Sequence, residues 1–261
     1  AAEELKFRIR KWIEKISPAG SDPTLGGMYV GTIHGFCLKK LRELAPEEFY
    51  DHDMIDDVAR LSLFQKKAYV LDIATLVTAS NLGQYQAIET FFDTYDQLNE
   101  HDQFEVQLTN DNLPNDVATE NDWIRGATIL TNVGNDSASQ AFGRTAARYY
   151  AYMRARRFLD FSTIQSELAR LFRRRPDLVA LVQQMHTHIV IDEVQDTNPV
   201  QLQIVRNLTG SHGNLTAVGD HRQAIYSFRG GRVDLMADLH QEFTNAADST
   251  VIELKNNYRS T

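Results

Sequence analysis

Residues 188–199 of this 261-residue chain have the sequence His-Ile-Val-Ile-Asp-Glu-Val-Gln-Asp-Thr-Asn-Pro. It begins with a short apolar run that ends at two carboxylates. An apolar run without alternation is typical of a parallel strand that is buried on both faces. Asn198 followed by Pro199 predicts a helix start, with an N-cap residue and then proline at the first helical position. A strand, a short turn and a helix form the repeating unit of an α/β fold.

The same pattern recurs in the last third of the chain. Residues 215–218 and 251–254 are two further apolar runs that predict strands, and the first of them ends shortly before Asp220. Strands that alternate with helices imply a parallel sheet. Ligands of such sheets bind at the carboxyl ends of the strands. In this chain those ends carry Asp192, Glu193 and Asp220, which are therefore the first candidate site residues.

The first two thirds of the chain have the patterning of a helical region. Apolar residues that recur at helical spacing predict amphipathic helices. Runs rich in proline, glycine and polar residues predict loops. We expect helices over residues 3–16, 34–44, 53–79, 84–99, 119–130, 139–157, 161–173 and 177–186, loops over 17–27 and 101–119, and a short strand over 28–32.

The composition is that of a folded soluble protein, with 43% apolar and 24% charged residues. No apolar run reaches the length of about 18 residues that a membrane-spanning helix needs. The single cysteine, Cys37, excludes a disulfide framework and a thiolate zinc site. No secretory signal is recognisable, so we expect a cytoplasmic protein without membrane attachment.

Charge is distributed unevenly along the chain. Residues 43–122 carry 18 acidic and three basic side chains, a net charge of −15, whereas residues 144–175 carry nine arginines against two acidic residues, a net charge of +7. A block of arginines can follow a phosphate backbone. The alternative is that the two blocks lie close together in the fold and neutralise each other.

Asp192 and Glu193 are adjacent carboxylates, which repel each other unless a cation lies beside them. Mg²⁺ takes few protein carboxylates and bridges to phosphate oxygens, and a second carboxylate can accept a proton from an attacking water. The alternative is a solvated strand end that binds no ligand.

The segment after residue 218 carries side chains suited to phosphate and base recognition. Gln223 offers both a hydrogen-bond donor and an acceptor, which suits it to sense a phosphate or a water. Tyr226 and Phe228, followed by Arg229, could stack on nucleobases and hold a phosphate. The alternative for the two aromatic residues is burial in the core.

Four motifs follow one another along the chain, and together they identify a resemblance to superfamily 1 DNA helicases of the UvrD/Rep type, including their RecB/AddA-like relatives. The sequence GTIHGF at 31–36, followed by Leu41-Arg42, resembles the DNA-contacting GTxHG motif. Residues 192–196 (DEVQD) resemble motif II, the Walker B equivalent, and residues 218–231 resemble motif III. Residues 257–260 (NYRS) resemble motif IV. The resemblance covers essentially the whole chain and is weakest from about 45 to 140.

The resemblance implies ATP and Mg²⁺ as cofactors. At the matching positions, Asp192 would hold Mg²⁺ and Glu193 would be the catalytic base for ATP hydrolysis. Gln223 would sense the γ-phosphate and couple it to DNA. Arg259 would contact the γ-phosphate and Tyr258 would stack on adenine. Asp220 is placed with the ATP-binding residues.

The resemblance also implies a set of DNA-binding residues. Thr32 and His34 would touch the DNA backbone, although a capping or core role is the alternative for His34. Tyr226 and Phe228 would stand among the bases, with Arg229 alongside. Single-stranded DNA and single-strand/duplex junctions are the expected partners, and a nuclease partner is expected if the chain is RecB/AddA-like.

The implied fold class is α/β, an incomplete RecA-like P-loop NTPase sheet with a mostly α-helical inserted subdomain. Residues 1–44 would be the first part of RecA-like domain 1A, without the Walker A strand and loop. Residues 45–145 would be the helical insertion subdomain 1B, and residues 146–261 the second part of domain 1A with motifs II, III and IV. No glycine in the chain is followed by lysine, so the phosphate-cradling Walker A loop is absent from this sequence.

We therefore expect a fragment of an ATP-dependent DNA helicase that translocates on single-stranded DNA and unwinds duplexes in repair or recombination. The fragment by itself should be inactive, since motifs V and VI are also missing, and its incomplete sheet is expected to favour self-association. One alternative is a non-catalytic nucleic-acid-binding module that retains motifs II and III. Another is a metal-dependent nuclease that uses Asp192, Glu193 and Asp196.

Overall fold

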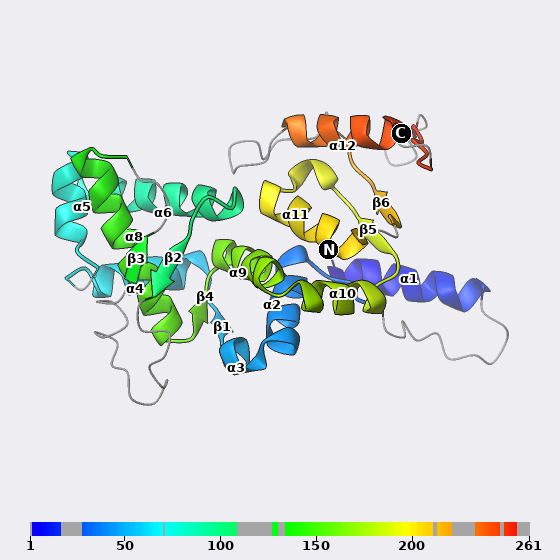
Figure 1. Ribbon diagram of the computed structural model, residues 1–261, viewed down its shortest axis with the longest axis horizontal. Coiled ribbons are helices and arrows are strands. Elements are labelled where there is room, and N and C mark those ends of the chain that lie inside the picture. Colours follow the sequence, from blue (N-terminus) through cyan, green and yellow to red (C-terminus); the bar gives the residue numbers. More distant parts are fainter. Residues whose placement is uncertain are drawn as a thin grey trace. The chain divides into compact units, whose positions relative to one another are not determined.

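The computed structural model describes residues 2–16, 28–69, 71–108, 127–129, 134–210, 213–220, 233–245 and 248–254 (Figure 1). The chain forms two compact units, Ala1–Leu178 and Val179–Thr261, and each is described by itself. It is mostly helical, with short pairs of strands, as expected for part of an α/β protein. No helix in the described ranges combines the length and the apolar character needed to cross a lipid bilayer.

Unit 1 holds most of the helices and two strand pairs. Its helices are α1 (Ala2–Ile16), α2 (Ile33–Leu44), α3 (Pro46–Phe49), α4 (Asp57–Lys66), α5 (Ile73–Ser80), α6 (Gln84–Glu100), α8 (Ser137–Ala155) and α9 (Phe161–Arg174), and α10 (Pro176–Met185) runs across the boundary to unit 2. Its strands pair as β1 (Asp53–Met54) with β4 (Phe158–Leu159), in parallel, and β2 (Val106–Leu108) with β3 (Ala127–Ile129), antiparallel.

The core of unit 1 is built from aromatic side chains of α4, α6 and α8. Phe64, Phe91, Tyr95 and Tyr149 are almost fully buried, and the ring centroids of contacting pairs lie 4.8–6.0 Å apart. Such pairs each contribute about 0.5–1.5 kcal/mol beyond the burial of their area. The three helices are therefore held together by one continuous aromatic cluster.

Helix α9 is the central helix of unit 1. Asp160 caps its N-terminus by accepting a hydrogen bond from the backbone N–H of Thr163, and every residue from Ser162 to Phe172 is buried. It packs against α2 on one side and against α6 on another, and Figure 1 shows α2 alongside it. Because α2 and α6 lie far apart in the sequence, α9 is the element that joins the N-terminal helices to the helical region from 57 to 155.

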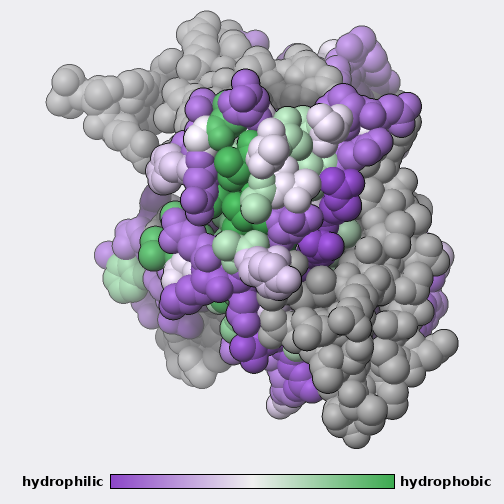
Figure 2. Space-filling model, turned by 90° about the vertical axis from the view of Figure 1, so that its left-hand side faces the viewer, coloured by the Kyte–Doolittle hydropathy of each residue, from purple (hydrophilic) through white to green (hydrophobic). Residues whose placement is uncertain are grey.

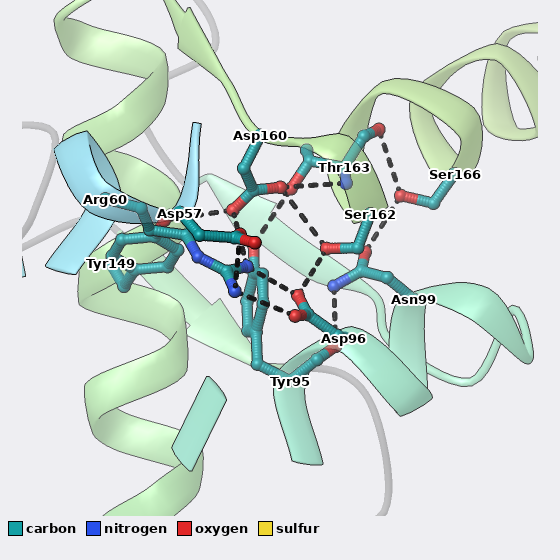
Figure 3. Close-up of polar contacts among 10 residues, drawn as sticks. All are labelled: Asp57, Arg60, Tyr95, Asp96, Asn99, Tyr149, Asp160, Ser162, Thr163 and Ser166. Carbon is teal, nitrogen blue, oxygen red and sulfur yellow. Dashed lines mark hydrogen bonds and ion pairs between the residues drawn. The ribbon is translucent and has the colours of Figure 1, made fainter. Parts of the chain in front are cut away.

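A buried polar network lies where α4, α6 and α8 meet the start of α9 (Figure 3). Arg60 is paired with Asp96 at 2.7 Å and lies 3.7 Å from the Asp160 carboxylate. Asp160 also accepts a hydrogen bond of 2.9 Å from the Tyr149 hydroxyl. The Ser162 hydroxyl donates to Asp96 at 2.7 Å. One guanidinium and two hydroxyls thus satisfy two carboxylates that lie in a largely apolar region.

The acidic and arginine-rich blocks of the sequence neutralise each other in unit 1. Arginines of residues 144–175 form ion pairs with carboxylates of residues 43–122 in at least five places. These pairs are Arg148–Asp72, Arg154–Glu48, Arg157–Asp51, Arg173–Asp102 and Arg174–Glu48. This outcome favours the alternative interpretation of the charge pattern over a continuous phosphate-binding track.

The outer surface of α5 offers little to a ligand. Figure 2 shows the side of the molecule that carries α5 in Figure 1, where a narrow strip of hydrophobic residues lies between hydrophilic ones. A shallow hollow of about 490 Å³ is lined by Ala74, Thr75, Thr78, Ala79 and Ser137. These side chains provide methyl and hydroxyl groups but no charge.

Several predicted elements of unit 1 are confirmed and others are wrong. Helices form close to the bounds expected for 3–16, 34–44, 84–99, 139–157, 161–173 and 177–186. Over 53–79, β1, α4 and α5 replace one long helix: α4 ends at Lys66, and Asp72 takes a left-handed backbone conformation (φ 61°) just before α5. The expected strand over 28–32 does not form, since residues 28–30 join no ladder and Thr32 caps α2. Part of the expected helix over 119–130 is β3, and the loop expected over 17–27 lies outside the described residues.

Unit 2 is a parallel strand pair with helices packed on one face. Its elements are β5 (Ile189–Ile191), the 3₁₀ turn η1 (Val194–Asp196), α11 (Pro199–Thr209), β6 (Leu215–Ala217) and α12 (Val233–Asn245). The strands pair in register from Ile189 with Leu215 to Ile191 with Ala217. As predicted, Asn198 caps α11, and its side chain and that of Gln201 form a reciprocal capping box.

One face of this strand pair is buried and the other is open within unit 2. Ile191 packs with Val205 of α11 and Leu239 of α12 in one core cluster. Val190 points to the opposite face and is 72% exposed. The apolar run predicted a strand buried on both faces. Among the described residues, only the face that carries Ile191 is buried. The third strand expected at 251–254 is also not formed, because these residues join no ladder.

Candidate active site

The carboxyl ends of β5 and β6 meet at one edge of unit 2. The backbone N–H of Val218 donates to the Ile191 carbonyl at 2.8 Å, and the N–H of Val194 donates to the Val218 carbonyl at 3.0 Å. These two hydrogen bonds continue the pairing past the ends of both strands. They bring the Asp192-Glu193 turn next to the segment that leads to Asp220, so the three carboxylates follow the same edge, as the parallel topology requires.

Glu193 occupies an unusual backbone conformation at this edge. Its φ of 52° and ψ of 45° lie in the left-handed region, which costs a residue with a side chain about 1–2 kcal/mol. The preceding Asp192 stabilises the turn, because its Oδ1 accepts a hydrogen bond of 3.0 Å from the Glu193 N–H. Both side chains are exposed. The turn therefore presents two adjacent carboxylates to solvent.

Gln195 connects the two strand ends through its side chain. Its Nε2 donates to Glu193 Oε2 at 2.7 Å, and its Oε1 accepts from the backbone N–H of Asp220 at 3.0 Å. The residue itself is buried. Gln195 was not among the site residues predicted from the sequence. A polar residue between the apolar Val194 and the start of α11 was the available signal, but its partner, the Asp220 N–H three residues after β6, is 25 residues away in the sequence.

A third carboxylate, that of Asp196, lies in the turn after Glu193. Partial burial, and then the charge of Glu193, raise the pKa of the nearby Asp196 carboxyl. Carboxylate oxygens are ligands that Mg²⁺ accepts, and Mg²⁺ completes its coordination with water and phosphate oxygens. In the described part of the chain, no group of three or more His, Cys, Asp or Glu residues is arranged to hold a metal ion.

Thr32 and His34 lie at the start of α2 in unit 1. The Thr32 hydroxyl accepts a hydrogen bond of 3.1 Å from the backbone N–H of Gly35 and so caps the helix. The His34 ring packs edge-on against Phe161 at a centroid distance of 5.3 Å. Burial lowers the pKa of His34, so the imidazole is neutral near pH 7. In the sequence GTIHG, Thr32 thus has the capping role and His34 a packing contact.

The two glycines of this motif have a steric explanation. A Cβ on Gly31 would lie 2.5 Å from the Tyr29 hydroxyl oxygen, and a Cβ on Gly35 would lie 2.9 Å from the same atom. The Tyr29 hydroxyl in turn donates to the Thr32 carbonyl at 3.1 Å. Both glycines therefore make room for one tyrosine that closes the turn before α2.

Two further residues near this motif have structural contacts. A guanidinium nitrogen of Arg42 donates to the His52 carbonyl at 2.5 Å and so ties α2 to the turn before β1. Cys37 is fully buried, and burial raises the pKa of its thiol to about 12, as expected for a packing residue.

The remaining predicted site residues lie outside the described part of the chain. They are Gln223, Tyr226, Phe228, Arg229, Tyr258 and Arg259. Of the predicted residues that are described, Asp192, Glu193 and Asp220 follow the carboxyl ends of β5 and β6 in unit 2, whereas Thr32 and His34 belong to unit 1.

Comparison with known proteins identifies the family to which the chain is related. The family model described as UvrD/REP helicase N-terminal domain matches residues 1–244. The putative ATP-dependent DNA helicase YjcD of Bacillus subtilis is 42% identical over 102 residues, which cover 39% of this chain and 13% of YjcD. ATP-dependent DNA helicase PcrA of the same organism is 25% identical over 261 residues, covering 100% of this chain and 30% of PcrA.

A mycobacterial helicase also matches this chain over its full length. ATP-dependent DNA helicase UvrD1 of Mycobacterium leprae is 25% identical over 281 aligned residues, again covering 100% of this chain and 30% of the relative. The chain thus spans less than a third of the length of each of these proteins. The family match itself extends over both units, from the α2 motif through the β5–β6 edge. The chain therefore belongs to the UvrD/REP helicase N-terminal domain family.

Proposed function

We propose that this chain is part of an ATP-dependent DNA helicase and that the edge formed by β5 and β6 is its ATP-hydrolysis site. The observation that carries the proposal is the pair of exposed carboxylates, Asp192 and Glu193, on a strained turn beside the end of β6. The relatives are named as ATP-dependent DNA helicases, which supports the same activity.

The two carboxylates have different roles in this proposal. Asp192 would hold Mg²⁺, which supplies charge stabilisation for the phosphate oxygens when bound. Glu193 would accept a proton from the water that attacks the γ-phosphorus, while the bond from that phosphorus to the ADP oxygen breaks. ADP and inorganic phosphate are the products. Asp220 belongs to the same edge and would orient water or the ion from the β6 side.

For the site residues outside the described part of the chain, we assign roles from their positions in the helicase motifs. Gln223 would sense the γ-phosphate, Arg259 would contact it and Tyr258 would stack on adenine. Tyr226 and Phe228 would stack on bases of single-stranded DNA with Arg229 at a phosphate.

Thr32 and His34 would lie near the DNA backbone. In the described structure the Thr32 hydroxyl caps α2 by accepting a hydrogen bond from the Gly35 N–H.

The domain organisation is part of the proposal. Residues 1–44 and 146–261 would be the two parts of a RecA-like domain 1A, and residues 45–145 an inserted subdomain 1B. The whole helicase would couple ATP hydrolysis to movement along single-stranded DNA and to duplex unwinding, in repair or recombination.

DNA-stimulated ATP hydrolysis tests the proposal. The assay compares this chain with a version extended at both ends to the natural termini of its gene, because the present sequence contains no Walker A loop. We expect turnover in the extended protein alone, and a loss of about 100-fold or more when Glu193→Gln removes the proton acceptor.

The matched control is Glu242→Gln, which makes the same chemical change at an exposed carboxylate of α12 that pairs with Arg206. Its turnover should stay within about twofold of the parent, because an exposed ion pair contributes little to stability. An extended protein that binds single-stranded DNA but hydrolyses no ATP would instead support the non-catalytic binding module.

A further inference from the structure

Both the oxygen and the nitrogen of the Gln195 side-chain amide form hydrogen bonds. The backbone N–H of Asp220 is a donor, so the amide atom that faces it at 3.0 Å must be the oxygen. The amide nitrogen is then the atom that faces Glu193 Oε2 at 2.7 Å, and it donates. The chemistry of the two neighbours therefore fixes the orientation of this amide.

The backbone around Glu193 is also held in place. The N–H of Asp196 donates to the Glu193 carbonyl at 2.9 Å, which closes the 3₁₀ turn after it. The Val194 N–H is tied to the Val218 carbonyl at 3.0 Å, on the strand that leads to Asp220. The side chain of Glu193 is exposed and has several rotatable bonds, so a fixed backbone alone does not fix its carboxylate.

We infer that Gln195 is a positioning residue, which holds the Glu193 carboxylate in register with the end of β6. The inference rests on the proposed function, in which Glu193 accepts a proton from the attacking water. An amide is suited to this task, because it donates a hydrogen bond without placing an opposite full charge next to the proton acceptor. Its burial keeps the amide itself in one place.

Two substitutions test the inference in the extended protein. Gln195→Met keeps the length of the side chain and removes both hydrogen bonds. Gln195→Glu keeps an acceptor for the Asp220 N–H and replaces the donor to Glu193 by a like charge. It is the variant to measure if Gln195→Met does not fold. For both variants we expect kcat for ATP hydrolysis to fall about 10- to 100-fold while KM for ATP stays within about threefold.

A double-mutant cycle separates positioning from a general loss of stability. In a Glu193→Gln background the Gln195→Met change should lower the residual single-turnover rate by less than about threefold, because there is no longer a base to position. The control is Gln183→Met in the same unit, which removes a hydrogen bond of 2.7 Å to the Asn207 carbonyl. It should lower Tm without changing kcat beyond about twofold.

The possible outcomes distinguish a failure of the positioning role from a failure of the proposed function. An active extended protein whose kcat is unchanged by Gln195→Met, or whose loss is equally large with and without Glu193, overturns the role of Gln195 and leaves the proposed function intact. An extended wild-type protein without ATP hydrolysis overturns the proposed function and, with it, the positioning role.

Discussion

Arg60 on α4 donates two hydrogen bonds to the Asp96 carboxylate on α6, with nitrogen–oxygen distances of 2.7 and 2.9 Å. The Asp160 carboxylate, at the start of α9, lies on the same guanidinium (Figure 3). The pair therefore fastens two helices of the region 57–155 to the central helix of unit 1. Aromatic packing fills the space around it, with Phe92 under the guanidinium at 4.3 Å.

Replacing Arg60 should destabilise unit 1 strongly. Arg60→Met leaves Asp96 and Asp160 close together without their counter-charge, and breaking a buried pair costs about 3–5 kcal/mol. Because the Asp96 side chain is 27% exposed, we expect the lower end of this range. Urea unfolding of this chain followed by circular dichroism gives the value.

The matched control is Arg148→Met, since Arg148 pairs with Asp72 at 3.3 Å and both side chains are about a third exposed. It should lower the free energy of unfolding by less than about 1 kcal/mol. Equal losses for the two variants would contradict a special role for the Arg60 network.

His52 should make unit 1 sensitive to acid. Its ring is buried against Phe49, and neither ring nitrogen has a hydrogen-bond partner among the described residues. Burial, and then the charge of Arg154, lower the pKa of His52 to about 4. Below about pH 6.5 the His52 ring is protonated in the unfolded chain but stays neutral in the folded chain. The free energy of unfolding therefore falls as the pH drops from 6.5 towards 4, by about 3 kcal/mol in total.

The acid effect is measured by comparing the free energy of unfolding at pH 7 and pH 4.5 for the parent and for His52→Leu. The substitution removes the titrating group and should flatten this pH dependence by about 2–3 kcal/mol. It should be nearly neutral at pH 7, because no hydrogen bond of the ring is lost there. A His101→Leu control should keep the acid sensitivity of the parent.

The charge pairing in unit 1 leads to a prediction about DNA binding. Arg157 is paired with Asp51 at 2.5 Å, so its charge already has a counter-charge within the protein. In the extended protein, Arg157→Gln should leave the affinity for single-stranded DNA and its salt dependence unchanged. A residue that contacts a phosphate would instead reduce the slope of log K against log salt by about 1. Fluorescence anisotropy at several salt concentrations measures this slope.

Local signals explain what the sequence predicted correctly. The apolar run at 189–191 and the Asn198-Pro199 helix start each depend on neighbouring residues, and β5 and α11 form where they were expected. The same run was expected to be buried on both faces, yet only the Ile191 side is covered in unit 2. A run of apolar residues identifies a strand but not which of its faces finds a partner.

Long-range contacts explain what the sequence did not predict. The helix expected from residue 53 begins only at Asp57, because Asp53 and Met54 pair with residues 158 and 159, more than a hundred positions away. The His34 ring packs on Phe161, and the Gln195 amide bonds to the end of β6. None of these partners can be recognised from the spacing of residues around it.

The strained turn at Glu193 provides a final prediction, which separates backbone strain from chemistry. Glu193→Gln and Glu193→Asn both replace the carboxylate by an amide, and neither is expected to support ATP hydrolysis in the extended protein. They differ in backbone preference, because asparagine enters the left-handed region more readily than glutamine, and the native φ is 52°. We therefore expect Glu193→Asn to be more stable than Glu193→Gln by about 0.5–1 kcal/mol in thermal unfolding of this chain. Equal stability of the two variants would mean that the turn relaxes once the carboxylate is gone, and that the carboxylate itself, through Gln195, holds the backbone in this conformation.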